Sequence, residues 1–162
     1  MTVKTGLRRR TAFSLSDDLR QIIFCCDEIF RLHERKDYLI PIAPRDKNPE
    51  LDHVSRTLEA VHDCLCIRVR GLMTNSIRND GKITGRDPLE IEDNPEFKKV
   101  REWASQDIAH TNFKNRKIVP SNRGAKMSRN YLYPGTLREV KRVSLLKLQE
   151  VEESNWGDSE FQ

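Results

Sequence analysis

His110 is the side chain in this sequence best placed for acid–base chemistry, because polar and charged residues surround it at helical spacing. Gln106 precedes it by four positions and Lys114 follows it by four, so a continuous α-helix would place all three on one face. Asp107 lies three positions before the histidine, and a carboxylate at that distance orients an imidazole and favours its charged form. Such a histidine suits acid–base catalysis of RNA cleavage, in which it activates the attacking 2′-hydroxyl or protonates the leaving oxygen. The same residues also match an ordinary Asp–His pair on a protein surface.

The chain around this histidine is strongly basic. Residues 111–142 hold nine basic residues and one acidic residue, whereas residues 150–162 hold five acidic residues and no basic one. A basic block beside a polar histidine suits a polyanion such as RNA, although a solvated polar loop has the same composition. The residues that we expect to contact phosphates are Lys114, Arg116, Lys117 and Arg123.

The remaining reactive side chains do not form a familiar motif. Cys25 and Cys26 are adjacent, and Cys64 and Cys66 are separated by one residue, so neither pair has zinc-knuckle or redox-motif spacing. His62 and Cys66 share a helical face but supply only two ligands, so we expect no metal site and reduced, packed thiols. The glycines match neither a phosphate loop nor a dinucleotide fingerprint, and no serine has a nucleophile-elbow context, so no cofactor is expected.

The other histidines have simpler interpretations. His33 and His53 fall near predicted helix ends, where a cationic or capping role is expected. His62 adjoins an apolar stripe in the middle of a predicted helix, which indicates a partly buried structural residue.

Apolar residues recur with a helical period in four segments. The pattern predicts helices over 14–36, 51–79, 94–117 and 136–153. The third has the clearest start, because Asn94 and Pro95 are typical of an N-cap and a first helical position. Four amphipathic helices in one small domain predict an all-α protein, an antiparallel four-helix bundle with long connecting loops, one of them over 118–135.

The ends of the chain differ from this domain in composition. We expect a flexible basic N-terminal segment over 1–13, a single helical domain over 14–153 and a flexible acidic tail over 154–162. No apolar run approaches the ~18 residues that span a membrane, and the N-terminus lacks the apolar stretch of a signal peptide. These features predict a cytoplasmic protein. The apolar stripes of the second and third helices are wide for a lone bundle, which favours a homodimer.

Three stretches carry a resemblance to a known family: VHDCLCIRVRGLMTN, QDIAHTNF and GTLREVKRVSLLKLQEV. The chain resembles prokaryotic HEPN domains, and among them the abortive-infection subgroup. The resemblance implies an all-α, usually dimeric domain that is often a metal-independent endoribonuclease. In such domains an arginine and a histidine, a few residues apart, line a cleft between protomers.

The histidine of that pair maps onto His110, but the arginine should then fall at Trp103, Ala104 or Ser105. Arg101 is the nearest arginine, and at nine positions from His110 it would lie on nearly the opposite face of a straight helix. Arg101 could join His110 only across a dimer, or Arg116 could substitute for the arginine from the far side. The nuclease pair is therefore expected to be incomplete.

The expected function is a HEPN-like module that binds RNA or a protein partner such as an antitoxin, in a prokaryotic defence or toxin–antitoxin setting. Two alternatives remain open at this point. One is an active endoribonuclease toxin that uses His110, and the other is a helical dimer with a purely structural role.

Overall fold

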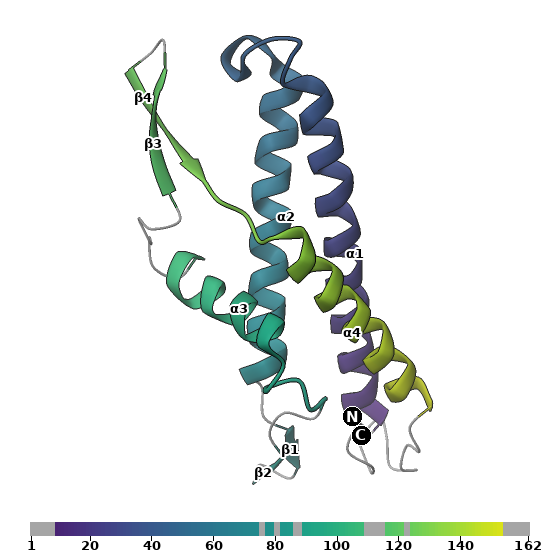
Figure 1. Ribbon diagram of the computed structural model, residues 1–162. Coiled ribbons are helices and arrows are strands. Elements are labelled where there is room, and N and C mark those ends of the chain that lie inside the picture. The colour runs from purple at the N-terminus through teal and green to yellow at the C-terminus, as the bar shows by residue number, and fades with distance from the viewer. Residues whose placement is uncertain are drawn as a thin grey trace.

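A computed structural model describes the backbone of residues 9–74, 77–79, 82–85, 89–108, 116–121 and 124–153, with side chains over 14–73, 89–106 and 130–153. Its α-helices are α1 (Arg9–Leu39), α2 (Pro49–Thr74), α3 (Pro95–Trp103) and α4 (Pro134–Glu153). Successive helices run in opposite directions (Figure 1). The predicted all-α class and antiparallel four-helix arrangement are confirmed.

The two longest helices form the centre of the molecule. α1 and α2 lie side by side along most of their length, α4 crosses α1, and the short α3 packs on α2 (Figure 1). Their inward faces are the apolar stripes of the sequence, which form one core. Fully buried members include Leu19, Ile22 and Ile29 of α1, Leu58, Leu65 and Val69 of α2, Phe97 and Val100 of α3, and Leu137 and Val140 of α4.

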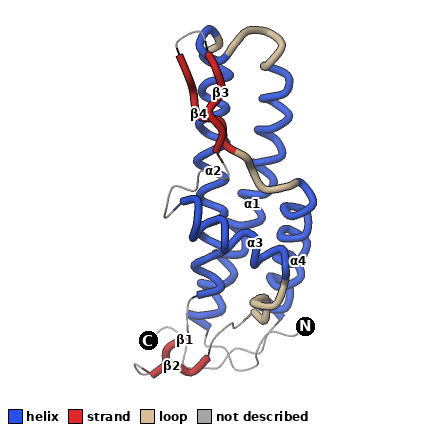
Figure 2. Tube along the Cα trace, turned by 60° about the vertical axis from the view of Figure 1, so that its left-hand side comes forward, coloured by secondary structure: helices blue, strands red, loops and turns tan. Residues whose placement is uncertain are grey.

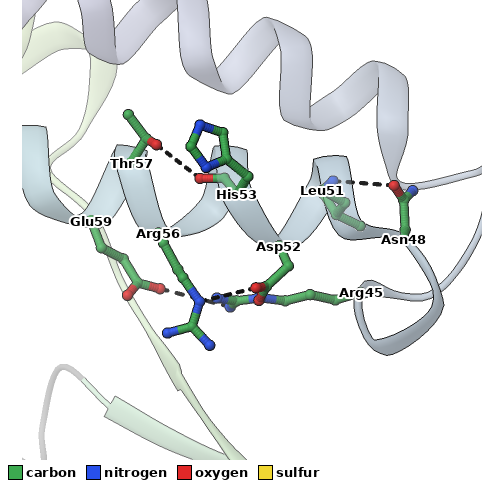
Figure 3. A network of polar contacts seen from close by, with 8 residues as sticks. All are labelled: Arg45, Asn48, Leu51, Asp52, His53, Arg56, Thr57 and Glu59. Atoms are coloured by element: carbon green, nitrogen blue, oxygen red, sulfur yellow. Dashed lines mark hydrogen bonds and ion pairs between the residues drawn. The ribbon is translucent and has the colours of Figure 1, made fainter.

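The same three residues, Asn-Pro-Glu, begin both α2 and α3. The Asn94 side chain accepts hydrogen bonds from the backbone N–H groups of Glu96 (3.0 Å) and Phe97 (3.2 Å), as its sequence position predicts. The Asn48 side chain accepts one from the N–H of Leu51 at 3.1 Å (Figure 3). Each asparagine therefore satisfies N–H groups that a helix start leaves without a carbonyl partner.

Salt bridges fasten the α1–α2 connection to the start of α2 (Figure 3). A short 3-10 helix, η1 (Arg45–Lys47), lies in this connection. The carboxylate of Asp52 accepts hydrogen bonds from Nε of Arg45 at 2.8 Å and Nε of Arg56 at 3.0 Å. Both hydrogen bonds lower the pKa of Asp52, and the one from Arg56 has the larger effect.

The start of α1 and the end of α2 differ from the predicted boundaries. α1 begins at Arg9, so residues 9–13 of the predicted flexible N-terminal segment are helical. Residues 1–8 lie outside the described residues. α2 ends at Thr74 rather than at residue 79. Helical periodicity alone overestimated its length, because residues 77–79 form a strand.

A β-hairpin follows α2, with β1 (Ile77–Asn79) paired antiparallel to β2 (Lys82–Gly85). The residues between the strands are Asp80 and Gly81, a pair that favours two-residue hairpin turns. The sequence therefore contained a hairpin signal at these two positions, and the predicted helix over 51–79 did not take it into account.

A second hairpin, β3 (Arg116–Ser121) with β4 (Gly124–Arg129), occupies most of the predicted 118–135 loop. The prediction that the third helix reaches Lys117 is wrong, because this residue belongs to β3. Ile118 and Val119 are β-branched and favour an extended backbone. Within the described part of the chain, no helix combines the length and apolar character needed to cross a membrane.

Candidate nucleic-acid interface

His62 of α2 lies at the centre of the site, with its side chain fully buried (0% exposed). Its Nε2 accepts a hydrogen bond of 3.0 Å from the backbone N–H of Leu132, so this nitrogen carries no proton. Its Nδ1 lies 4.0 Å from Sγ of Cys66. The sequence predicted a partly buried structural residue, and the structure shows a fully buried ring that accepts a backbone hydrogen bond.

Two aromatic side chains pack on the His62 ring from different parts of the chain. The ring centroid of Trp103 lies 5.4 Å away and that of Tyr131 lies 5.3 Å away, both in edge-on arrangements. Trp103 ends α3, and Tyr131 follows β4 by two residues. One histidine of α2 therefore fixes both ends of the segment that contains the basic hairpin.

His33 of α1 extends this cluster. Its ring meets Tyr131 edge-on with centroids 5.3 Å apart, and Nζ of Lys36 lies 5.4 Å from the centroid of the tyrosine ring. Burial is the main cause that lowers the pKa of His33, and the positive charge of Lys36 is the second cause. His33 therefore favours its neutral form and packs against an aromatic ring, in contrast to the expected cationic or capping role. We call His33, His62, Trp103 and Tyr131 the basal cluster.

The β3–β4 hairpin, which we call the basic arm (residues 116–129), rises from the basal cluster. In both views it extends toward the end of the molecule that holds the α1–α2 connection (Figures 1 and 2). Arg116 lies opposite Arg129 across the ladder, and Lys126 lies opposite Val119. The sequence from Lys114 to Arg129 holds six basic residues and no acidic one. The fold thus gathers positive charge on a two-stranded ribbon.

The predicted third helix departs from regular α-helix within the stretch that holds the predicted catalytic residues. Ala104–Ile108 forms a π-helical turn, η2. Such a turn has a longer hydrogen-bond period than an α-helix. The α-helical spacing that the prediction assumed therefore does not hold over 104–108, and the positions of His110 and Lys114 lie outside the described residues.

The predicted site residues fall into three groups. Arg101 is half-buried on α3 and Gln106 is exposed on η2, whereas only the backbone of Asp107 is described. Arg116 and Lys117 belong to β3. His110, Lys114 and Arg123 lie outside the described residues.

The sequence-based prediction overlooked the aromatic residues that fix the arm. Trp103 and Tyr131 flank the basic block in the sequence, but no spacing rule connects either of them with His62. Lys126 and Arg129 were also outside the predicted phosphate contacts, and strand pairing brings them opposite β3. Recognition of the hairpin would have indicated Lys126 and Arg129, but not the two aromatic residues.

No group of three histidine, cysteine or acidic side chains suitable for a metal ion occurs among the described residues. Comparison with known proteins then gives a plain result. No family model, curated protein or solved structure matches this chain. The geometry of the arm and its base therefore supplies the argument for function.

Proposed function

We propose that this protein is a helical RNA-binding module whose basic arm contacts the phosphate backbone. The observation that carries the proposal is the pairing of Arg116 with Arg129 in a ribbon whose sequence contains no acidic residue. Like charges directly opposite each other destabilise a strand pair. A phosphate group between or beside them relieves this repulsion, which makes a polyanion the natural ligand.

The basal cluster supports this role mechanically. His62 contacts residues at both ends of the arm, Trp103 before it and Tyr131 after it. A ribbon that is fixed at its base loses less conformational freedom on binding than a free basic loop. The helical bundle therefore acts as the scaffold that presents the arm.

The likeness to HEPN domains supports RNA as the ligand and a non-catalytic role. Trp103 occupies one of the three positions where that family's arginine should lie, and its ring packs on His62. This position therefore contributes to the base of the arm instead of a nuclease pair. A homodimer in a prokaryotic defence or toxin–antitoxin setting is part of the same proposal.

Fluorescence anisotropy with a labelled single-stranded RNA tests the proposal. The variant Arg116→Gln/Lys117→Gln/Lys126→Gln removes three charges from the arm. We expect it to weaken binding by roughly 10–100-fold near 0.1 M salt and to reduce the salt slope by about 2, because each phosphate contact contributes about 0.7. The matched control, Arg31→Gln/Arg56→Gln/Arg142→Gln, removes three charges that the structure pairs with Glu28, Asp52 and Glu139, and should change affinity less than about 3-fold.

Equal losses for the two variants would show that binding follows net charge, and would reject the arm as the interface. Absence of RNA binding at physiological salt would favour a protein partner or a structural role. Metal-independent cleavage of the RNA that disappears in His110→Ala would replace the non-catalytic proposal with the endoribonuclease alternative. His110→Ala is otherwise expected to leave RNA binding unchanged.

A further inference from the structure

The exposed side of α4 has apolar residues at its centre and opposite charges toward its two ends. The other side of this helix lies in the core. The exposed residues recur at the spacing of a single helix face. They are Arg138, Arg142, Leu145, Leu146, Gln149, Glu152 and Glu153, which we call the outer face of α4. Neighbouring exposed leucines in the middle of a helix face are typical of a surface that contacts another protein.

Phe24 of α1 lies beside the outer face. α4 crosses α1, and two ion pairs join the helices (Figure 1). These pairs are Arg20 with Glu152 and Asp27 with Lys141. Arg20 lies four residues before Phe24 and Asp27 three residues after it, so all three share one side of α1. Phe24 therefore lies near the middle of α4, between the two ion pairs.

The centre of the combined surface is apolar. Leu145 and Leu146 are 47% and 48% exposed, and Phe24 is 58% exposed. Specific protein interfaces have an apolar centre that a polar rim surrounds. Contact with a second apolar patch would remove these three side chains from water, and this burial favours association.

The charges of the outer face form two opposite halves. Arg138 and Arg142 precede the leucines, whereas Glu152 and Glu153 follow them. A second copy that lies antiparallel, with a two-fold axis at the leucines, brings each basic half beside the acidic half of its partner. A parallel copy would pair like charges. The outer face is therefore complementary to itself in the antiparallel orientation.

We propose that two copies of this chain form a dimer in which the outer faces of α4 pack antiparallel, with the leucines and Phe24 at the centre. The interface deepens the proposed function, on whose homodimer it rests, and it is independent of RNA binding. Within one chain, Arg142 pairs with Glu139 and Glu152 pairs with Arg20. Exposed ion pairs of this kind contribute little, so both groups can exchange their partners for those of the second copy.

Sedimentation velocity of the full-length protein without RNA tests this interface. The variant Arg138→Glu/Arg142→Glu makes all charges of the outer face acidic, and Glu152→Arg/Glu153→Arg makes them all basic. Each variant sets like charges against its own copy, so we expect self-association to weaken by at least roughly 100-fold. Neither change opposes the helix dipole of α4, and circular dichroism checks that the helix is retained.

An equimolar mixture of the two variants is the decisive sample. The acidic face of one complements the basic face of the other, so the mixture should recover a dimer that neither variant forms alone. The control, Lys47→Glu/Arg56→Glu, changes the net charge as much as the first variant does, but near the α1–α2 connection, and should remain dimeric.

Four outcomes would overturn the interface: a monomeric original protein, variants that dimerise as tightly as the original, a mixture that stays monomeric, or an equal loss of the dimer in the control. RNA binding by the basic arm has its own test and does not depend on any of these outcomes.

Discussion

At the scale of single residues, His62 connects the core with the base of the basic arm. Its ring fills a fully buried space, accepts the Leu132 N–H and packs on two aromatic rings. These interactions come from one α2 side chain but involve the segments on both sides of the basic arm. Loss of the ring therefore affects the core and the base of the arm together.

We predict that His62→Ala lowers the free energy of unfolding by about 3–4 kcal/mol, because it leaves a cavity and an N–H without its acceptor. Urea unfolding followed by circular dichroism measures the change. His53→Ala, an exposed position in the same helix, is the matched control and should cost less than about 0.5 kcal/mol. Similar losses of stability for the two variants would show that His62 and the basal cluster do not stabilise the fold.

The lowered pKa of His33 makes a second prediction at this scale. Between the folded-state pKa and the ordinary value near 6.5, the unfolded chain binds a proton that the folded chain does not. Stability therefore falls as the pH drops below about 6.5, and this contribution is fully present above it.

Urea unfolding at several pH values between 5 and 8 should show a shallower pH dependence for His33→Gln than for the original protein. Because His33 is only half-buried, the difference should stay well under about 1.4 kcal/mol per pH unit. Parallel pH profiles for the two proteins would rule out this contribution. Carboxylates titrate in both proteins, so they cancel in the comparison.

At the scale of elements, the two asparagine caps differ in the number of hydrogen bonds that their side chains make. Asn94 is bonded to the first turn of α3 through its side-chain oxygen. Asn48 caps α2 and also donates through Nδ2 to the carbonyl oxygens of Leu39 (3.2 Å) and Ala43 (3.4 Å). Asn48 therefore joins the end of α1, the connection and the start of α2.

We expect Asn94→Ala to lower the free energy of unfolding by about 1 kcal/mol and Asn48→Ala by about 2–3 kcal/mol, because the second change also leaves carbonyl groups without donors. Asn48→Asp separates the two effects, since aspartate keeps the accepting oxygen but loses the Nδ2 donor. Its loss should fall between zero and that of Asn48→Ala. A loss for Asn48→Ala no larger than that for Asn94→Ala would contradict the bridging role.

At the scale of the whole molecule, the basic arm has few contacts with the helical body. Within the described residues, the strands of the arm associate mainly with each other, whereas the helices share one core. The basal cluster lies on the helical side of this division. Folding of the bundle is therefore expected not to require the arm.

Replacement of residues 116–129 with a flexible Gly-Ser linker of about eight residues tests this separation. We predict that helical circular dichroism is retained and that Tm changes by less than about 4 °C, because no core residue is removed. RNA binding should be lost in the same protein. Collapse of the helical signal would show that the arm is an integral part of the fold.

The sequence by itself determined the helices and their buried faces. A helix places apolar residues at this spacing on one face, so they are buried together. Leu19 and Ile22 in α1 and Phe97 and Val100 in α3 are examples. Asn94 and Pro95 likewise set the start of α3, because their effect on the backbone is local. The basic composition of the segment after α3 was also evident without a structure.

Only the tertiary structure decided how distant residues combine. Strand pairing places Arg129 opposite Arg116, and helix packing brings His62 to Trp103 and Tyr131. Short strands and single buried contacts depend on neighbours far along the chain, and periodicity within a segment holds no information about those neighbours.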